Sequence, residues 1–346
     1  MSTLFFTGYP GFLGASLLPR LLARSAGSRA RCLVQSKFVA LARERAAGDP
    51  RIEIIEGDIT SPITASTDDV IEIYHLAAIY DLMVKRDAGM RVNVDGTRNV
   101  LDFARRCPSL RRVHYVSTCY VSGRYDGVFK ETDLEKGQAF NNYYEETKYL
   151  AEVEVQKRMR DGLPATIYRP SVVVGDSATG ATQKFDGPYF VMRWLLKQPR
   201  VAVLPVLMHA DRYRFNVVPR DFIIDALDRL SAMPDAIGKV FQLADPEPLT
   251  VDETIEAVAR ATNRTVIRIP MPLVVAKASL DYVPGVYRLM QIPSAAVDYF
   301  CHPTLYDVTN TRSALGDLSI PRFRDYLPRL VDFVRAHPEI GSAAMA

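Results

Sequence analysis

The sequence is poor in the residues that build metal centres and disulfide frameworks. It holds four cysteines and five histidines in 346 residues. They are dispersed, with neither a C-x-x-C pair nor metal-ligand spacing, which argues against a zinc site and a disulfide-stapled fold. We therefore expect reduced cysteines, no metal and a cytoplasmic location.

Long hydrophobic runs and a strong excess of one charge are also lacking. No window reaches the roughly 18–20 apolar residues that a transmembrane helix needs, and the apolar stretch from Met271 to Ala276 is short. The chain runs from Met1 directly into a glycine-rich loop, so we expect no secretory signal. A net charge of +3 gives no reason to expect a nucleic-acid partner.

The first half of the chain does contain a regular alternation of strand-like and helix-like segments. Apolar runs typical of buried strands are 3–7, 30–34, 52–56, 70–76, 112–117 and 165–168. The segments with helical spacing are 12–26, 38–47, 94–106 and 144–161. This alternation predicts an α/β fold with a doubly wound parallel sheet covered on both faces.

The pattern changes near residue 175. A polar loop over 176–188 leads into segments rich in proline, methionine and aromatic residues, 189–215 and 265–305, which we interpret as an irregular second lobe. Strand-like runs at 215–218 and 239–243 return to the first lobe, and 322–337 has the pattern of a final amphipathic helix. We predict a dinucleotide-binding domain over 1–175 with returning segments near 215–245, and a smaller, partly helical substrate lobe over 176–346, interleaved with the first.

A glycine-rich loop joins the first predicted strand to the first predicted helix. Glycine allows a tight turn, a close approach of the backbone to phosphate and close packing of helix on strand. The helix amino terminus adds free N–H groups for a pyrophosphate. The predicted cofactor-binding residues of this loop are Gly8, Tyr9, Pro10, Gly11, Phe12, Leu13 and Gly14. The alternative is a tight turn without a ligand.

The end of the second strand bears on the choice of cofactor. NAD-binding proteins usually place an acid there, and this chain instead has Gln35, Ser36 and Lys37, which could hold a 2′-phosphate, with Arg31 as a further candidate. We therefore favour NADPH over NADH. After the third strand, Asp58 and the adjoining Ile59 could contact the adenine; the alternative for Asp58 is a turn or helix cap.

Tyr144 and Lys148 lie one helical turn apart on the predicted helix 144–161, so their side chains project from one face. A free tyrosine titrates near pH ~10, and a nearby cation lowers the pKa of the phenol. The pair could therefore move protons at neutral pH. The alternative is a plain pair of side chains on a solvated helix face.

Seven ordered motifs resemble the extended short-chain dehydrogenase/reductase family over roughly residues 3–245. They are the loop 8–14, His75-Leu76-Ala77-Ala78, Asn93 to Thr97, Ser117 to Gly123, Tyr144 with Lys148, Arg169 to Gly175, and Val218 to Asp221. Within that family, the sequence is most similar to the fatty acyl-CoA reductase and thioester reductase branch. The segments that carry this similarity are 11–14, 116–121 and 142–148.

The resemblance implies roles for particular residues. Tyr144 would exchange a proton with the substrate oxygen, Lys148 would hold the nicotinamide ribose, and Thr118 would orient the carbonyl. The motif alignment favours Thr118 over Ser117, which should point to the opposite face of its strand. Further cofactor-binding residues implied by the family are Leu76, Ala77, Ala78, Asn93, Arg169, Pro170, Ser171 and Val172, although Arg169 has a structural reading as well.

The expected activity is hydride transfer from NADPH to a small hydrophobic carbonyl substrate, namely an aldehyde, a ketone or a fatty acyl thioester. Alternatives are a nucleotide-sugar epimerase or dehydratase with bound NAD, and a non-catalytic dinucleotide-binding sensor. A homodimer is common in the family. Residues that could line an apolar pocket, or belong to the core, are Tyr189, Phe190, Met192, Trp194, Met208, Tyr213, Met290 and Tyr299.

Overall fold

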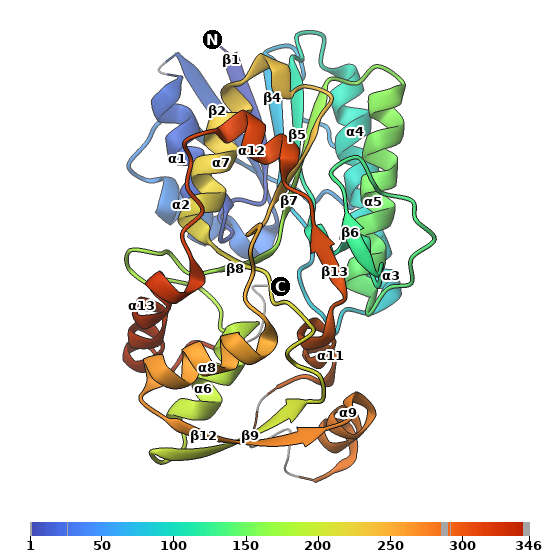
Figure 1. The fold of residues 1–346 in the computed structure, drawn as a ribbon. Helices are drawn as coiled ribbons and strands as arrows, with labels where there is room; N and C mark the ends of the chain where they lie inside the picture. The colour runs from blue at the N-terminus through green and yellow to red at the C-terminus, as the bar shows by residue number, and fades with distance from the viewer. Residues whose placement is uncertain (1, 26, 285–289, 291, 342–346) are drawn as a thin grey trace.

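A computed structural model describes residues 2–25, 27–284, 290 and 292–341 of the chain (Figure 1). Parts of two expectations lie outside the described residues: Ala26 at the end of the first predicted helix, and residues 285–289 and 291 of the second lobe.

The first lobe is built on a seven-stranded parallel sheet of order β11-β7-β5-β4-β1-β2-β3. Its strands are β1 (Ser2–Thr7), β2 (Ser28–Val34), β3 (Ile52–Glu56), β4 (Val70–His75), β5 (Arg112–Val116), β7 (Ala165–Pro170) and β11 (Val240–Leu243). The strand order reverses direction between β1 and β4, which opens a ligand crevice at the carboxyl ends of such sheets. The predicted doubly wound fold is confirmed.

Helices cover both faces of this sheet (Figure 1). One face carries α1 (Gly14–Arg24), α2 (Val39–Ala46) and α7 (Arg220–Ala232), and the other carries α4 (Gly96–Arg106) and α5 (Tyr143–Arg160). Successive side chains of β1 serve the two layers: Phe6 packs in the cluster of α1 and α7, and Phe5 packs 4.4 Å from the ring of Phe103 on α4. The strands therefore read as continuous apolar runs.

Local signals fix the ends of the helices that matter for function. Asn142 caps α5, because its side chain accepts a hydrogen bond from the backbone N–H of Glu145 at 3.0 Å. The helix expected over 94–106 begins earlier than predicted, with α3 (Arg86–Gly89) and a wide helical turn, η2 (Met90–Asp95), leading into α4. Short 3-10 turns are η1 (Ser36–Phe38), η3 (Cys119–Ser122), η4 (Pro234–Ala236) and η5 (Asp298–Cys301).

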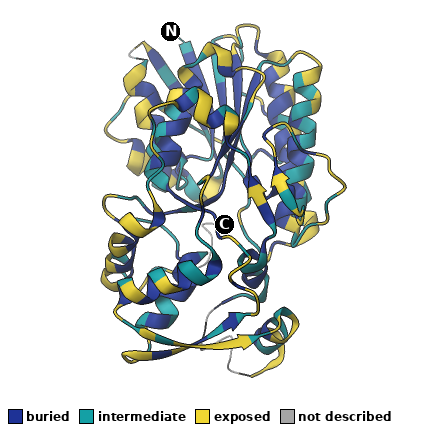
Figure 2. Cartoon of the chain, in the orientation of Figure 1, coloured by how far each residue is buried: buried dark blue, intermediate teal, exposed yellow. Residues whose placement is uncertain are grey.

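The second lobe is more regular than the sequence suggested, so the interpretation of 189–215 and 265–305 as irregular is wrong for most of their length. Its elements are α6 (Pro188–Leu196), β9 (Val201–Leu207), α8 (Val251–Thr262), β12 (Thr265–Met271), α9 (Leu273–Tyr282), α11 (Ser294–Val297) and α13 (Phe323–Ala336). A separate apolar core joins α6, α8 and α13 (Figure 2). Mixed aromatic and proline composition concealed the helical periodicity.

Three short parallel pairs lie outside the main sheet, and the β9–β12 pair belongs wholly to the second lobe. β8 (Val172–Val174) pairs with β10 (Val217–Pro219), β6 (Gly127–Phe129) with β13 (Thr304–Tyr306), and β9 with β12. The predicted strand 239–243 joins the main sheet as β11, whereas the strand near 215–218 pairs with β8 outside it. Helix α12 (Thr309–Leu315) then crosses back toward β11. The division at residue 175 stays a prediction.

Candidate active site

The glycine loop has a backbone that tolerates no side chain at its first glycine. Gly8 has φ +92°, and a Cβ there would lie 2.8 Å from the backbone nitrogen of Ala77. A Cβ on Gly11 would lie 2.8 Å from the carbonyl oxygen of Gly8, which accepts the N–H of Gly11 at 2.9 Å. Leu13 has no polar side chain to cap α1. The N–H groups of Ala15 and Ser16 donate to the carbonyls of Gly11 and Leu13, which leaves the N–H of Gly14, at the start of the helix, for an anion. The loop fits a pyrophosphate.

The other loop residues are held by the protein itself. Tyr9 is buried in the core, the carbonyl oxygen of Pro10 accepts a hydrogen bond from Arg45 at 2.6 Å, and Arg220 lies 5.2 Å from the ring of Phe12. These side chains shape the loop, and the backbone of the loop is the part left to face a dinucleotide.

The segment after β4 runs directly beside this loop. Thr7 accepts the backbone N–H of Leu76 at 3.1 Å on its carbonyl and that of Ala77 at 3.3 Å on its hydroxyl. Next along the segment, the N–H of Ile79 donates to the side chain of Asn93 at 2.9 Å. Asn93 is buried, and its amide also donates to Thr147 on α5 at 3.0 Å. Its side chain thus braces the cofactor segment against α5.

At the predicted adenosine end of the site, polar side chains after β2 bond carboxylates after and at the end of β3. Gln35 donates to Asp58 at 2.7 Å. Asp58 also accepts the N–H of Thr60 at 2.8 Å, as a turn residue does. Ser36 donates to Glu56 at 2.5 Å, and the ammonium of Lys37 lies 5.0 Å from the ring of Phe38. A hollow of about 410 Å³ adjoins Gly57 and Asp58.

One residue at this end differs from the sequence-based expectation. Arg31 is buried and bonds Glu53 at 3.0 Å and Asp69 at 3.2 Å, so the proposal that it holds a 2′-phosphate is wrong. Ile59 is buried, and its carbonyl accepts Asn99 at 2.7 Å. The sequence analysis did not predict Glu56 as part of this end of the site. Glu56 ends β3, whereas its hydrogen-bond partner Ser36 follows β2, and the sequence alone does not show that the two meet.

The three predicted catalytic side chains converge at the carboxyl ends of β5 and β7. Lys148 is buried on α5; its ammonium donates to the carbonyl of Val116 at 2.8 Å and lies 4.6 Å from the ring of Tyr115. The Thr118 hydroxyl lies close enough to the phenol of Tyr144 to lower its pKa, and it donates to the carbonyl oxygen of Pro170 at 3.3 Å. All three belong to segments that the parallel sheet brings to one edge.

Ser117 points the other way. Its hydroxyl donates to Glu152 of α5 at 2.6 Å inside the protein. The alternation of side chains along an extended backbone places Ser117 and Thr118 on opposite sides, which supports Thr118 as the residue of the pair that faces Tyr144.

The electrostatics of the pair differ from the expectation based on spacing. Burial raises the pKa of Tyr144, and the carboxylates of Glu145 and Asp186 raise it further, while the hydrogen bond with Thr118 lowers it. Burial lowers the pKa of Lys148 to about 7, against an upward pull from Glu152. The expected lowering of the Tyr144 pKa by Lys148 is not seen in this structure, because burial disfavours the charged form of both groups and the pKa of Tyr144 rises.

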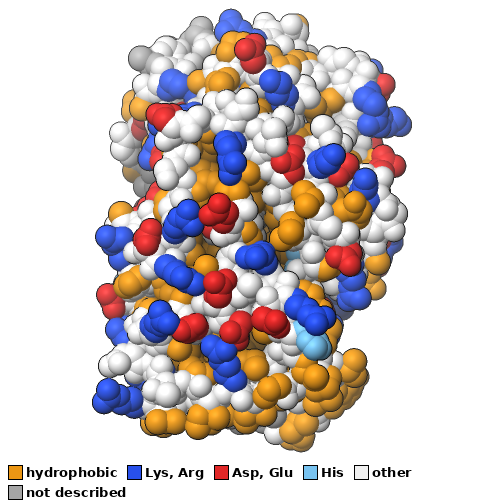
Figure 3. All heavy atoms as spheres, in the orientation of Figure 1, with side chains coloured by type: hydrophobic (Ala, Val, Ile, Leu, Met, Phe, Trp, Pro, Cys, Tyr) orange, Lys and Arg blue, Asp and Glu red, His pale blue; other side chains and the backbone are white. Residues whose placement is uncertain are grey.

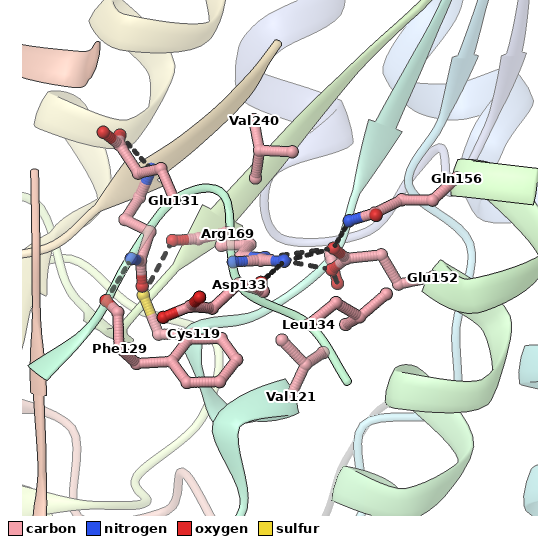
Figure 4. Close-up of polar contacts among 12 residues, drawn as sticks. Cys119, Val121, Phe129, Glu131, Asp133, Leu134, Glu152, Gln156, Arg169 and Val240 are labelled. Carbon is pink, nitrogen blue, oxygen red and sulfur yellow. Dashed lines mark hydrogen bonds and ion pairs between the residues drawn. The ribbon is translucent and has the colours of Figure 1, made fainter. Parts of the chain in front are cut away.

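Arg169 belongs to an ionic lock rather than to a cofactor contact. Its guanidinium lies 2.6 Å from Glu152 and donates to the carbonyl of Asp133 at 2.7 Å, and both members of the pair are fully buried (Figure 4). This geometry supports a structural role for Arg169, because its guanidinium is held by the protein and is not available to a dinucleotide. Nearby Ser171 is different, because its buried hydroxyl has no hydrogen-bond partner among the described residues, so it could receive a polar group of a ligand.

Aromatic side chains gather near Tyr144; we call Tyr80, Tyr120 and Tyr299 the aromatic wall. The ring of Tyr80 lies 5.1 Å from that of Tyr144, edge to face, and the ammonium of Lys184 lies 4.2 Å from Tyr80. Lys184 pairs with Asp186 at 2.9 Å. Sequence reasoning missed these residues, which come from the loop after β4 and the loop before α6. The aromatic and charged character of those loops was the available signal.

A second part of this wall comes from the segments after β5 and α9. The rings of Tyr120 and Tyr299 lie 4.5 Å apart. Glu145 is buried beside Tyr144 and accepts the N–H of Asn141 at 2.8 Å, and burial raises its pKa to about 7. Glu145 was also missed, although it adjoins Tyr144 in the sequence.

Most of the predicted pocket residues belong elsewhere. Tyr189, Phe190 and Met192 are buried core residues, and the hydroxyl of Tyr189 accepts the N–H of Gly175 at 2.9 Å. Four others have contacts elsewhere. Trp194 donates to the carbonyl of Val203 on β9, and Met208 is exposed. Tyr213 packs in the core of α6 and α8, and Met290 packs near α9. Tyr299 is the member that reaches the aromatic wall.

Two further features of the described residues bear on function. Over residues 2–25, 27–284, 290 and 292–341, no three His, Cys, Asp or Glu side chains are grouped as a metal site would require. Within the same ranges, no helix combines the length and the apolar character needed to span a bilayer.

Comparison with known proteins places these features in a class. The model of the family described as "Male sterility protein" matches residues 6–227. A 3β-hydroxysteroid dehydrogenase/Δ5→4-isomerase of Mycobacterium tuberculosis is 32% identical over 277 residues, which are 75% of this chain and 69% of that protein. The crystal structure of the terminal R domain from the myxalamid PKS-NRPS pathway has a TM-score of 0.83 and 26% identity, covering 98% of this chain and 91% of that one.

Larger proteins match as well. The nonribosomal peptide synthetase asaC of Aspergillus flavus is 24% identical over 355 residues, 90% of this chain, and the chain spans 34% of its length. The fold and the glycine loop are those of the NAD(P)-dependent reductases and dehydrogenases. Within that class, the chain belongs to the male sterility protein family of extended short-chain dehydrogenases/reductases.

Proposed function

We propose that this protein is an NADPH-dependent oxidoreductase that transfers a hydride to the carbonyl carbon of an aldehyde, a ketone or a fatty acyl thioester. The observation that carries the proposal is the convergence of Thr118, Tyr144 and Lys148 at the edge of the sheet where the glycine loop also lies. A dinucleotide sensor without chemistry has no need of these three groups together.

The chain offers a fitting cradle for the dinucleotide. Gly8, Gly11 and the amino-terminal end of α1 would hold the pyrophosphate, and the buried hydroxyl of Ser171 would meet the nicotinamide half. No acid directly follows β2, and Lys37 there supports a 2′-phosphate, with Glu56 and Asp58 held by Ser36 and Gln35. When bound, the reduced nicotinamide supplies the hydride.

The protein's own groups would manage the substrate oxygen. The Thr118 hydroxyl would orient the carbonyl, and the Tyr144 hydroxyl would donate its proton to the oxygen as negative charge develops there. A protonated Lys148 favours the phenolate that this transfer leaves behind. Because burial brings the pKa of Lys148 to about 7, its charge state changes within the physiological range.

The aromatic wall supports a hydrophobic substrate. Tyr80 packs edge to face on Tyr144, and Tyr120 packs on Tyr299, an aromatic lining that suits an apolar molecule with one carbonyl. The relatedness to a steroid dehydrogenase and to an R domain points in the same direction.

The test is the replacement of one hydroxyl. The wild type, Tyr144→Phe and the matched control Tyr143→Phe, whose ring is half-exposed, are incubated with NADPH and a panel of aldehydes, ketones and acyl-CoAs. Turnover is followed as loss of absorbance at the reduced nicotinamide band, and dinucleotide binding by calorimetry. We expect Tyr144→Phe to bind NADPH normally and to lose about 10²–10⁴-fold in kcat, with the control unchanged. Near-wild-type turnover would remove Tyr144 from proton transfer, and NAD retained through purification would favour an epimerase.

A further inference from the structure

The part of the second lobe furthest from the sheet exposes an apolar ribbon. β9 and β12 pair in parallel, and their inner face packs on α6 and α8 through residues such as Leu204. Cross-strand partners share a face, so Val203 and Ile267 lie together on the outer side, and Ile269 follows two residues along. Ile267 is 53% exposed. Contiguous exposed apolar surface of this kind usually marks a site that binds a protein, a membrane or a ligand.

Helix α9 extends this surface. Its Ala276 and Leu280 pack against Phe190, which leaves Val274, 77% exposed, and Tyr282 facing outward. Figure 3 shows apolar side chains gathered along the lower edge of the molecule, beneath β9, β12 and α9. We call this surface the distal face; its members are Val201, Val203, Ile267, Ile269, Val274, Val275 and Tyr282.

The charges around the distal face are mostly positive. The two segments that carry it, 197–209 and 264–284, contain five lysines and arginines and one acid, Asp281, in a chain with 43 basic and 40 acidic residues. Arg268 pairs with Asp252 of α8 and Lys277 with Asp298, whereas the guanidinium of Arg264 bonds backbone carbonyls, which do not neutralise its charge. Arg200 is exposed at the start of β9. The basic rim of the apolar surface therefore lies mainly where β9 and β12 begin.

We infer that the distal face docks onto the surface of an anionic lipid bilayer. A flat apolar surface with an aromatic residue and a basic rim matches the headgroup boundary, where apolar side chains enter the acyl region and cations meet lipid phosphates. A second copy of the chain would bring two basic rims together, which disfavours self-association through this face. This inference is independent of the reaction catalysed.

Vesicle flotation tests the inference on the full chain. The wild type is mixed with phosphatidylcholine vesicles, with or without phosphatidylglycerol. Two variants accompany it: the double substitution Ile269→Asp with Val274→Asp, and the control Val128→Asp, at an exposed apolar position on β6. We expect the wild type and the control to float with the anionic vesicles, less so at high salt, and the double variant to bind at least about tenfold more weakly.

Several results would overturn the inference. They are failure of the wild type to float with anionic vesicles at low salt, equal binding to both kinds of vesicle, wild-type binding by the double variant, and a wild-type dimer that the double variant dissolves. Thermal unfolding checks that each variant is folded, and Ile269→Thr with Val274→Ser replaces the aspartates if they prevent folding.

Discussion

Replacing Lys148 by methionine should stabilise the ligand-free protein at low pH and abolish its activity. The ammonium is buried, and its pKa falls from 10.5 to about 7. At about 1.4 kcal/mol per pKa unit, burying this charge costs up to about 5 kcal/mol below the folded pKa. Methionine has a similar length without the charge, so the variant escapes this cost.

Two losses oppose the gain. The variant leaves the carbonyl of Val116 without its donor, at about 1–3 kcal/mol, and removes the contact with the ring of Tyr115, at about 1 kcal/mol. We therefore expect a net stabilisation of about 1–3 kcal/mol at about pH 6. Between the two pKa values the unfolded chain binds one more proton than the folded chain, so wild-type stability rises with pH across this window.

Urea unfolding at about pH 6, 8 and 10 measures this difference. The advantage of Lys148→Met should shrink as pH rises and become a disadvantage near pH 10, because the wild-type lysine is then neutral in the folded protein. Lys157→Met, on the exposed side of the same helix, serves as the control and should show little dependence on pH. A stability difference for Lys148→Met that stays constant from pH 6 to 10 would refute the reasoning.

Other predictions follow from the loop, the ionic lock and the hydroxyl pair. Gly8→Ala should weaken NADPH binding more than about tenfold in calorimetry, because alanine resists φ +92° and its Cβ meets backbone; unchanged affinity would contradict the role of the loop. Glu152→Gln should cost about 3–5 kcal/mol in urea unfolding, since it leaves a buried guanidinium unpaired, whereas Glu154→Gln, from a surface pair, should cost under about 1 kcal/mol. Thr118→Ala should lower kcat about 10²–10³-fold, while Ser117→Ala should keep kcat and lose about 1–3 kcal/mol of stability; the reverse pattern would exchange their roles.

The fold was predictable because its signals are local. Apolar runs and helical spacing located nearly all elements of the main sheet, and the glycine loop identified the crevice. The second lobe was less accessible, since the parallel pairing of β9 with β12 joins segments about 60 residues apart, and no local pattern specifies such pairing.

The sequence predicted that Tyr144 and Lys148 lie together, but it did not predict the surroundings of the site. Tyr144 and Lys148 share a helix face by spacing alone, but spacing says nothing of burial, which sets their pKa values. Arg31 was misjudged because its partners, Glu53 and Asp69, lie on other segments. Charge clustering around the distal face was equally hidden, because its basic residues come from two distant stretches of chain.

The ionic lock between Glu152 and Arg169 has a consequence for how this enzyme class diversifies. Glu152 lies one helical turn beyond Lys148, and its carboxylate holds both Ser117 after β5 and Arg169 on β7. The Glu152 carboxylate thus ties α5 to the carboxyl ends of β5 and β7, whereas Asn142, which caps α5, meets the second lobe through a hydrogen bond of 3.4 Å to Tyr299. Substitutions around Tyr80 can therefore change the proposed substrate pocket while the proposed proton-transfer residues keep their alignment with the sheet.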